Sequence, residues 1–283
     1  MNIYIVIPAH NEADCISLTL ESIVKQTLLP KQLVIVNDNS TDNTKSIVEK
    51  FVSKHSWITL INSTSSNKHL PGSKIINAFY KGFKILDSNY DIICKFDADL
   101  IFPENYLEKI SNHFKGNAKL GMAAGFCYIS KNDNWVIENL TRKDHIRGAL
   151  KAYRKKCFND IGKLKPAMGW DTVDELLAQY YDWELLTDSS LHVKHLKPTG
   201  INYNKSAKYL QGEAMYKMRY GFLLNLLTAL KMGVKKRKIS YFNNYMVGYC
   251  KAVINKPDRL VTISQGVFIR KLRWKNILQK LKK

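Results

Sequence analysis

The chain has 283 residues, of which 45% are hydrophobic and 24% are charged. This length suits one full α/β domain with an additional segment, and this composition excludes a disordered or fibrous protein. The net charge of +20 is unevenly distributed, because residues 194–283 hold 21 basic and two acidic residues, whereas residues 1–193 hold 23 basic and 22 acidic ones. The sequence therefore predicts a nearly neutral domain over residues 1–200 and a basic tail over residues 201–283.

The five cysteines are far apart and show no spacing typical of a zinc site or a disulfide framework, so we expect reduced thiols in a cytoplasmic protein. The first apolar run begins at Ile3, and we expect no signal peptide ahead of it. Residues 220–230 form the most apolar stretch, but it is shorter than the roughly 18–20 residues of a spanning helix. The sequence therefore does not predict a membrane span, although it allows the protein to lie on a membrane.

Short apolar runs alternate with amphipathic helical patterns in the first hundred residues. The spacing predicts strands over residues 3–8, 33–36, 57–61 and 91–96, with helices over residues 14–27, 41–52 and 73–86 between them. Continuous apolar strands alternating with helices are typical of a parallel sheet covered on both faces, which binds its ligands beyond the carboxyl ends of the strands.

The pattern becomes mixed after this series. It predicts a helix over residues 104–114, a strand over 120–129, a polar loop up to about residue 144, helices over 147–158 and 172–181, and a last strand over 190–195. Pro198-Thr199-Gly200 then marks the expected end of the neutral domain.

Polar motifs follow three of the predicted strands. They are Pro8-Ala9-His10-Asn11-Glu12, then Asn37-Asp38-Asn39-Ser40-Thr41-Asp42, and finally Asp97-Ala98-Asp99. Each of the first two, taken alone, is more often a capped turn than a site. The two aspartates after residue 96 differ, because carboxylates this close repel each other unless a hard divalent cation lies between them and a bound phosphate.

Together these motifs resemble those of the family 2 glycosyltransferases, which use nucleotide sugars and have the GT-A fold. The resemblance covers about 200 residues and includes residues 5–12, residues 38–42, Gly72-Ser73-Lys74 with Asn77, and Asp97-Ala98-Asp99. Residues 169–176, Gly-Trp-Asp-Thr-Val-Asp-Glu-Leu, look like the acidic motif on the acceptor side of the family, with the order of the acidic pair reversed. The implied fold is α/β, a mostly parallel sheet flanked by helices, with a basic helical extension at the C-terminal end.

The resemblance implies roles for individual residues. The residues expected to bind the nucleotide sugar are Pro8, Ala9, His10, Glu12, Asp38, Lys74, Asp97 and Ala98. Asp97 and Asp99 are expected to hold Mn²⁺ or Mg²⁺, with His195 as a further ligand that would favour manganese. A lone histidine is more often structural, and His192 on the same strand is an alternative ligand.

An inverting transfer needs a carboxylate that takes the proton from the acceptor hydroxyl. We expect this base in the acidic motif, with Asp174 preferred over Glu175 and Asp171. All three lie near a predicted helix start, where carboxylates also serve as caps, so capping is the competing explanation. The donor is expected to be a UDP-sugar, since Asp38 suits the N3–H of a pyrimidine, although guanine offers N–H donors too.

The tail combines basic residues with apolar and aromatic residues at helical spacing, which is typical of an interfacial helix on an anionic membrane. The tail could instead pack on the catalytic domain or on another subunit of a homo-oligomer. We expect no nucleic-acid partner, because no recognised nucleic-acid-binding motif accompanies the charge. The sequence thus favours a peripheral enzyme on the cytoplasmic face of the membrane that extends a glycan or lipid-linked acceptor. The alternatives are transfer to polyprenyl phosphate and a non-catalytic nucleotide-sugar-binding protein.

Overall fold

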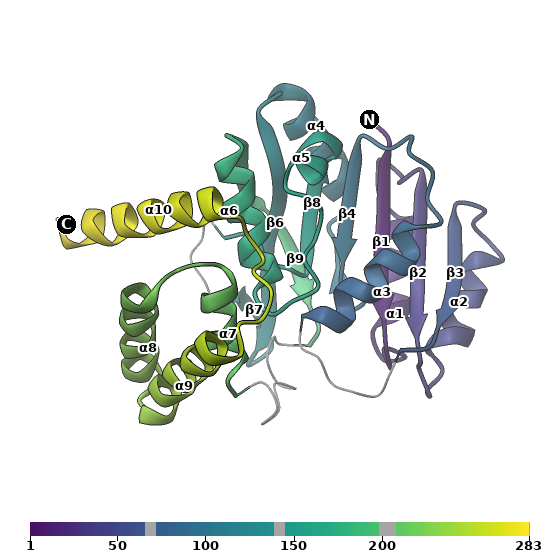
Figure 1. Ribbon diagram of the computed structural model, residues 1–283. Coiled ribbons are helices and arrows are strands. Elements are labelled where there is room, and N and C mark those ends of the chain that lie inside the picture. Colours follow the sequence, from purple (N-terminus) through teal and green to yellow (C-terminus); the bar gives the residue numbers. More distant parts are fainter. Residues whose placement is uncertain (66–71, 139–144, 198–207, 283) are drawn as a thin grey trace.

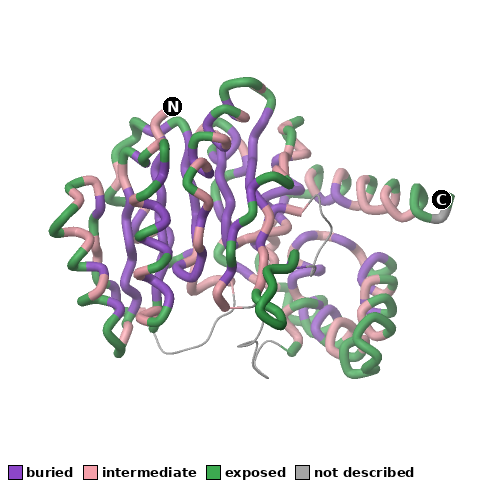
Figure 2. The backbone as a smooth tube through the Cα atoms, turned by 180° about the vertical axis from the view of Figure 1, so that it is seen from behind, coloured by how far each residue is buried: buried purple, intermediate pink, exposed green. Residues whose placement is uncertain are grey.

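The computed structural model describes residues 1–65, 72–138, 145–197 and 208–282. Its centre is a nine-stranded sheet in which eight strands follow the order β3-β2-β1-β4-β8-β6-β9-β5, while β7 pairs with β6 at the side. Figure 1 shows the sheet with its helices, and Figure 2 shows that the strands are the most buried part of the chain. The first four strands confirm the alternation predicted from the sequence.

The first half of the sheet is parallel. It consists of β1 (Ile3–Ala9), β2 (Gln32–Asp38), β3 (Ile58–Ser63) and β4 (Ile92–Phe96), connected by α1 (Ile16–Val24), α2 (Thr44–Val52) and α3 (Ser73–Phe83). Every residue of β1 and β4 is buried, because helices cover both faces of the sheet. α1 and α2 lie on one face and α3 on the other (Figure 1), so the carboxyl ends of all four strands meet at one edge.

The second half of the sheet is mixed. Its strands are β5 (Leu100–Ile101), β6 (Leu120–Lys131), β7 (Asn134–Ile137), β8 (Leu150–Arg154) and β9 (Glu184–His195), and its helices are α4 (Tyr106–Gly116), α5 (Lys155–Asp160) and α6 (Trp170–Tyr180). β8 runs antiparallel to both β4 and β6, while β9 runs parallel to β6. β9 begins six residues earlier than the sequence predicts, and the short strands β5 and β7 were not predicted.

The helix predicted over residues 147–158 is wrong. Residues 150–154 form a strand instead, and only residues 155–160 are helical. Leu, Lys, Ala and Arg favour helices locally, but this segment fills the position between β4 and β6, where hydrogen bonds to β4 and burial outweigh local preference.

The C-terminal part is helical, as predicted. It consists of α7 (Leu210–Lys217), α8 (Phe222–Lys236), α9 (Ile239–Asn255) and α10 (Ile263–Leu281). α7 crosses α9 so closely that a Cβ atom at Gly248 would lie 2.0 Å from the carbonyl oxygen of Tyr209. The ring of Phe268 in α10 packs edge-on against Tyr180 of α6. The expected boundary at Pro198-Thr199-Gly200 lies outside the described residues, and the division into two domains stays a prediction.

Candidate active site

The loops after β1 and β2 are joined to each other by hydrogen bonds at the carboxyl edge of the sheet. The side-chain oxygen of Asn11 accepts a hydrogen bond from the backbone N–H of Thr41 at 2.8 Å. The backbone N–H of Asn11 donates to the hydroxyl of Ser40 at 3.0 Å. The N–H of Glu12 donates to the hydroxyl of Thr44 at 2.8 Å. These polar residues form turns, as expected for such motifs taken alone. The turns also bring the two motifs together.

Asp38 lies at the end of β2 with a side chain that is nearly buried. Its two carboxylate oxygens accept hydrogen bonds from the hydroxyls of Ser63 at 3.0 Å and Ser65 at 2.7 Å. The Nδ1 atom of His10 lies 2.7 Å from the backbone carbonyl oxygen of Asp38, while Pro8 and Ala9 are buried at the end of β1. The carboxylate is therefore held in one orientation, as a group that recognises the edge of a base must be.

Glu12 faces a lysine that the sequence did not single out. Its carboxylate lies 2.6 Å from the Nζ atom of Lys197, which follows β9. Burial raises the pKa of Glu12 even though the charge of Lys197 works in the opposite direction. Lys74 lies in the first turn of α3 and is half-buried. The structure thus brings Glu12 to the carboxyl edge and adds a cation beside it.

Asp97 and Asp99 follow β4, and each faces a different nitrogen-bearing side chain. The carboxylate of Asp97 forms an ion pair with the buried Lys95, and Asp99 lies 3.4 Å from the Nε2 atom of His195. Ala98 is buried between them, and its carbonyl accepts a hydrogen bond from the hydroxyl of Thr19 at 2.7 Å. These contacts reduce the repulsion that the sequence predicts for the two carboxylates.

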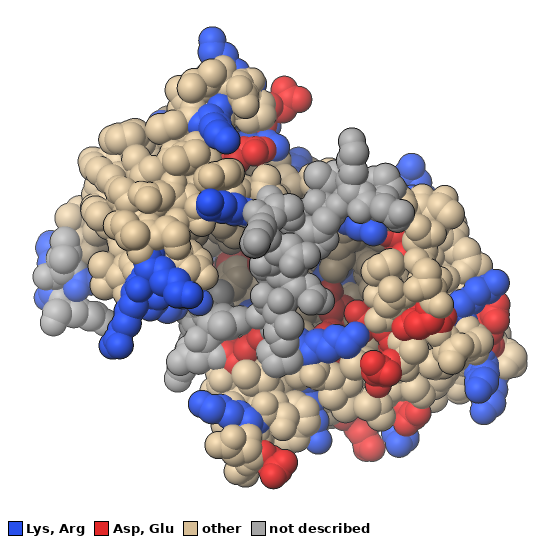
Figure 3. All heavy atoms as spheres, turned by 90° about the horizontal axis from the view of Figure 1, so that it is seen from below, with Lys and Arg blue, Asp and Glu red and all other residues tan. Residues whose placement is uncertain are grey.

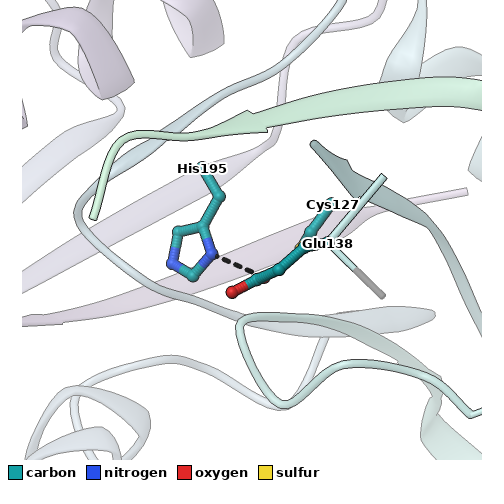
Figure 4. Close-up of side chains that lie close together, drawn as sticks. All are labelled: Cys127, Glu138 and His195. Carbon is teal, nitrogen blue, oxygen red and sulfur yellow. Dashed lines mark hydrogen bonds and ion pairs between the residues drawn. The ribbon is translucent and has the colours of Figure 1, made fainter. Parts of the chain in front are cut away.

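His195 is buried at the end of β9, with one ring nitrogen on each side facing a carboxylate. Its Nδ1 atom lies 3.0 Å from Glu138 (Figure 4), and its Nε2 atom faces Asp99. Burial alone would lower the pKa of His195, but the hydrogen bonds to Asp99 and Glu138 raise it to about 9. The alternative ligand His192 is exposed, and its ring stacks beside Tyr128.

The surroundings of His195 fit a divalent cation. A metal-binding histidine usually donates its second ring N–H to a carboxylate, and Glu138 is placed to accept it, which leaves Nε2 beside Asp99. Cys127, Glu138 and His195 each place one potential ligand atom within 4.8 Å of the others. Burial raises the pKa of the Cys127 thiol to about 12.

Asp174 in α6 is enclosed by hydrogen-bond donors. Its two carboxylate oxygens lie 2.8 and 2.9 Å from the Nζ atom of Lys151, and one of them accepts from the hydroxyl of Tyr153 at 2.6 Å. Asp174 is 1% exposed and the lysine is fully buried. Burial raises the pKa of Asp174. The carboxylate is therefore committed to a buried ion pair and is poorly placed to meet an acceptor.

Glu175 lies beside the same lysine at 3.4 Å. It accepts from the N–H of Ile146 at 2.8 Å and contacts the ring of His145, whose Nδ1 atom is 3.1 Å away. Burial alone would raise the pKa of Glu175, but the charge of Lys151 and the hydrogen bond with His145 lower it. Glu175 thus holds His145 in place.

Asp171 differs from both, because its side chain is 38% exposed. The Nε2 atom of His145, on the ring that Glu175 holds, lies 3.9 Å from the carboxylate of Asp171. α6 begins after Gly169 with no side-chain cap hydrogen bond, and Asp171 lies in its first turn, where the helix dipole favours a carboxylate. Among the three candidates, Asp171 is the carboxylate that solvent reaches most easily.

Sequence reasoning missed several residues of this site, namely Lys95, Glu138, His145, Lys151, Tyr153 and Lys197. The lysine at position 95 carried a usable signal, because a lysine within the apolar run Ile-Ile-Cys-Lys-Phe is buried only when it is paired. Glu138 and His145 carried none, since Glu138 meets His195 from 57 residues away, besides its ion pair with Arg147, and His145 meets Glu175 from 30 residues away.

The carboxylates and their paired cations lie at the carboxyl edge of a mostly parallel sheet, which is where the class of open α/β proteins binds its ligands. The family model described as glycosyl transferase family 2 matches residues 4–166. The chain therefore belongs to glycosyl transferase family 2.

Relatives of known sequence carry the same assignment. The uncharacterized glycosyltransferase MG025 of Mycoplasma genitalium is 30% identical over 175 residues, which cover 57% of this chain and 56% of the relative. A poly-beta-1,6-N-acetyl-D-glucosamine synthase of Staphylococcus epidermidis is 24% identical over 181 residues, 58% of this chain and 40% of that protein. The chain thus spans about half the length, or less, of these curated relatives.

Solved structures share the fold. S. aureus TarS 1–349 in complex with UDP-GlcNAc has a TM-score of 0.57 at 20% identity, covering 82% of this chain and 67% of TarS. The mannosyltransferase PcManGT from Pyrobaculum calidifontis in complex with GDP-Man and Mn²⁺ has a TM-score of 0.56 at 13% identity, covering 98% of this chain and 80% of that one. These likenesses show that the expected GT-A fold is correct.

Proposed function

We propose that the protein is an inverting, divalent-metal-dependent glycosyltransferase that moves a sugar from a UDP-sugar to a hydroxyl group of a glycan or lipid-linked glycan. One observation carries this proposal: His195 lies between Asp99 and Glu138 at the carboxyl edge of the sheet, and Asp97 precedes Asp99 by two residues. A nucleoside diphosphate leaves readily only when its negative charge is neutralised, and this is the place where a cation could do so.

Asp38 is the proposed contact to the base, with Pro8, Ala9 and His10 beside it and Glu12 near the ribose. Its carboxylate is oriented by Ser63 and Ser65, so it can accept the N3–H of uracil. TarS has been solved with UDP-GlcNAc and PcManGT with GDP-Man, so neighbours of this fold bind either nucleotide. We favour uridine because a single fixed carboxylate matches a single N–H donor. Lys74 is proposed to contact the diphosphate or ribose.

Asp97, Asp99 and His195 are the proposed ligands of Mn²⁺ or Mg²⁺, and Asp97 with Ala98 would also meet the ribose. When bound, the ion would act as a Lewis acid for the departing diphosphate. Manganese is favoured over magnesium because one of the three side chains is an imidazole. Glu138 orients this imidazole, and Lys95 holds the carboxylate of Asp97. PcManGT, a neighbour of the same fold, was solved with Mn²⁺.

We propose Asp171 as the base, in place of Asp174, which we preferred on the sequence alone. A general base must come within hydrogen-bond reach of the acceptor hydroxyl, and Asp171 is far more exposed than Asp174. Glu175 acts through His145 to position the Asp171 side chain. Transfer to a phosphate acceptor needs little base catalysis, so an Asp171→Asn variant that keeps full activity would favour a polyprenyl-phosphate acceptor.

The protein is proposed to act at the cytoplasmic face of the membrane and to contact the membrane through its C-terminal helices. Residues 208–282 contain 17 basic and two acidic residues, which suits an anionic surface. None of the helices within the described ranges is long and apolar enough to cross a membrane. The acceptor is proposed to be a growing glycan, since the relative from Staphylococcus epidermidis is named as a glycan synthase.

A thermal-shift panel tests donor and metal together. We expect UDP and UDP-sugars to raise the melting temperature in the presence of Mn²⁺ or Mg²⁺ but not with a chelator, and GDP and dTDP to have a smaller effect. Asp99→Asn should abolish the shift, whereas Asp258→Asn, which changes an exposed aspartate in the tail, should keep it. A metal-independent shift of equal size, or an Asp99→Asn variant that responds like the wild type, would overturn the proposed metal site.

A further inference from the structure

Helix α8 carries an apolar stripe that faces away from the rest of the protein. Leu223, Leu227, Leu230 and Val234 recur at intervals of four, three and four residues, so they lie on one face of the helix. Their exposed fractions are 53%, 37%, 48% and 79%. Four large apolar side chains exposed in one row are unusual for a surface that meets only water.

The other face of α8 already has its packing partner. Leu224, Asn225 and Ala229 are buried, and the side-chain amide of Asn225 lies 3.5 Å from the sulfur of Met246 in α9. The contact with α9 therefore accounts for the burial of one face of α8, and the stripe is not needed to hold the two helices together.

Strong positive charge lies at the end of the stripe. Residues 235–238, Lys-Lys-Arg-Lys, are the last two residues of α8 and the two-residue connection to α9, and all four are exposed. Within the described residues 208–282 the acidic side chains are Glu213 and Asp258, and the first of these pairs with Lys217. The left-hand lobe in Figure 3, which carries these helices, shows mostly uncharged surface bordered by Lys and Arg, with a few acidic groups at its upper right.

From this pairing of an exposed apolar row with adjacent cations, we infer that α8 and residues 235–238 form the surface by which the protein lies on an anionic lipid bilayer. The helix axis would lie in the plane of the membrane, with the stripe among the acyl chains and residues 235–238 at the headgroups. This inference rests on the proposed membrane location and assigns that role to one helix among the four.

The charge of this surface also decides between a lipid and a second copy of the chain. A symmetric dimer through α8 would bring the same patch of each copy together, and neither copy would contribute acidic residues of the patch to offset the positive charge at its end. An anionic bilayer instead supplies the opposite charge and an apolar interior at once. α8 to α10 lie at the end of the molecule away from β3 in both Figure 1 and Figure 2, so the bulk of the sheet does not stand in the way.

Vesicle flotation with the whole protein tests this inference. The wild type should bind vesicles that contain phosphatidylglycerol and should bind neutral phosphatidylcholine vesicles much less. Leu223→Ser with Leu230→Ser should lower the partition coefficient at least about tenfold. The matched control is Leu29→Ser with Ile85→Ser, a pair on the neutral domain with exposed fractions of 48% and 51%, which should bind like the wild type.

The outcomes separate the inference from the proposals on which it rests. If the wild type binds and the α8 variant binds equally well, α8 is not the contact, although the membrane location stands. If the wild type does not bind at all, the location and the inference both fail, while a metal-dependent response to UDP would leave the transferase proposal intact. If the α8 variant instead changes only the oligomeric state in light scattering, the stripe is an interface between copies and the inference is overturned.

Discussion

Replacing Asp174 with Asn is expected to lower the free energy of unfolding, whereas replacing Asp171 with Asn is expected to lower the rate of sugar transfer. Asp174 and Lys151 are both buried, and each carboxylate oxygen of Asp174 lies within 2.9 Å of the lysine nitrogen. Removing one member of a buried ion pair typically costs ~3–5 kcal/mol, because the remaining charge has no counterpart. The two replacements therefore separate a structural carboxylate from a catalytic one within a single helix.

The magnitude follows from what remains around Lys151. Glu175 still lies 3.4 Å from its nitrogen, and the asparagine side chain still offers an oxygen to Tyr153. We therefore expect the lower end of the range, about 3 kcal/mol in the free energy of unfolding, which is a fall in melting temperature of about 6–12 °C. Asp171→Asn should change the free energy of unfolding by no more than about 0.5 kcal/mol, since the side chain is partly exposed.

The assay combines urea unfolding followed by circular dichroism with release of the nucleoside diphosphate at a temperature where both variants are folded. Asp171→Asn should lower kcat about 10²- to 10⁴-fold, the usual contribution of a general base. Asp174→Asn should keep most of its turnover while folded. The reasoning would be refuted by an Asp174→Asn variant as stable as the wild type but inactive, or by an Asp171→Asn variant with normal turnover.

Three further changes test the metal site, the helical packing and an ion pair on the domain surface. Glu138→Gln should weaken Mn²⁺ binding ~10- to 100-fold, measured by electron paramagnetic resonance, because Glu138 no longer holds the ring of His195 as firmly. An unchanged affinity for Mn²⁺ would contradict the proposal that Glu138 orients His195. Gly248→Ala should cost about 1–3 kcal/mol in urea unfolding, since the added methyl group would meet the Tyr209 carbonyl oxygen; an equally stable variant would show that the helices can separate at no cost. Burial alone would raise the pKa of Asp188, but hydrogen bonds from Ser190 and neighbouring groups lower it in the folded protein. The ionised carboxylate therefore stabilises the fold at any pH above its unfolded pKa of ~3.9. This stabilisation is lost as the pH falls through the lower pKa of the folded protein. Asp188→Asn should therefore be about 1 kcal/mol less stable than the wild type near neutral pH, and the difference should shrink as the pH falls through the lowered folded pKa; a constant difference would show that the ionised form has no special role.

Most of the parallel half of the fold could be predicted from the sequence, because its signals are local. Apolar runs such as residues 3–8 and 91–96 are strands that the sheet buries on both faces, and the polar motifs follow them directly. Since the carboxyl ends of parallel strands meet at one edge, the order of elements alone placed Asp38, Asp97 and Asp99 at that edge. The family, too, could be recognised from these motifs, whose order and spacing are properties of the sequence.

The tertiary structure decided what local spacing cannot express. The strand at residues 150–154 looks helical by itself and is a strand because a gap between β4 and β6 needs one. The sequence favoured Asp174 over Asp171 and Glu175, but in the fold Asp174 of α6 pairs with Lys151 of β8, while Asp171 stays partly exposed. The sequence by itself therefore determined which residue types stand at the carboxyl edge of the sheet, and the packing of distant segments decided which of them are buried in ion pairs and which can reach a substrate.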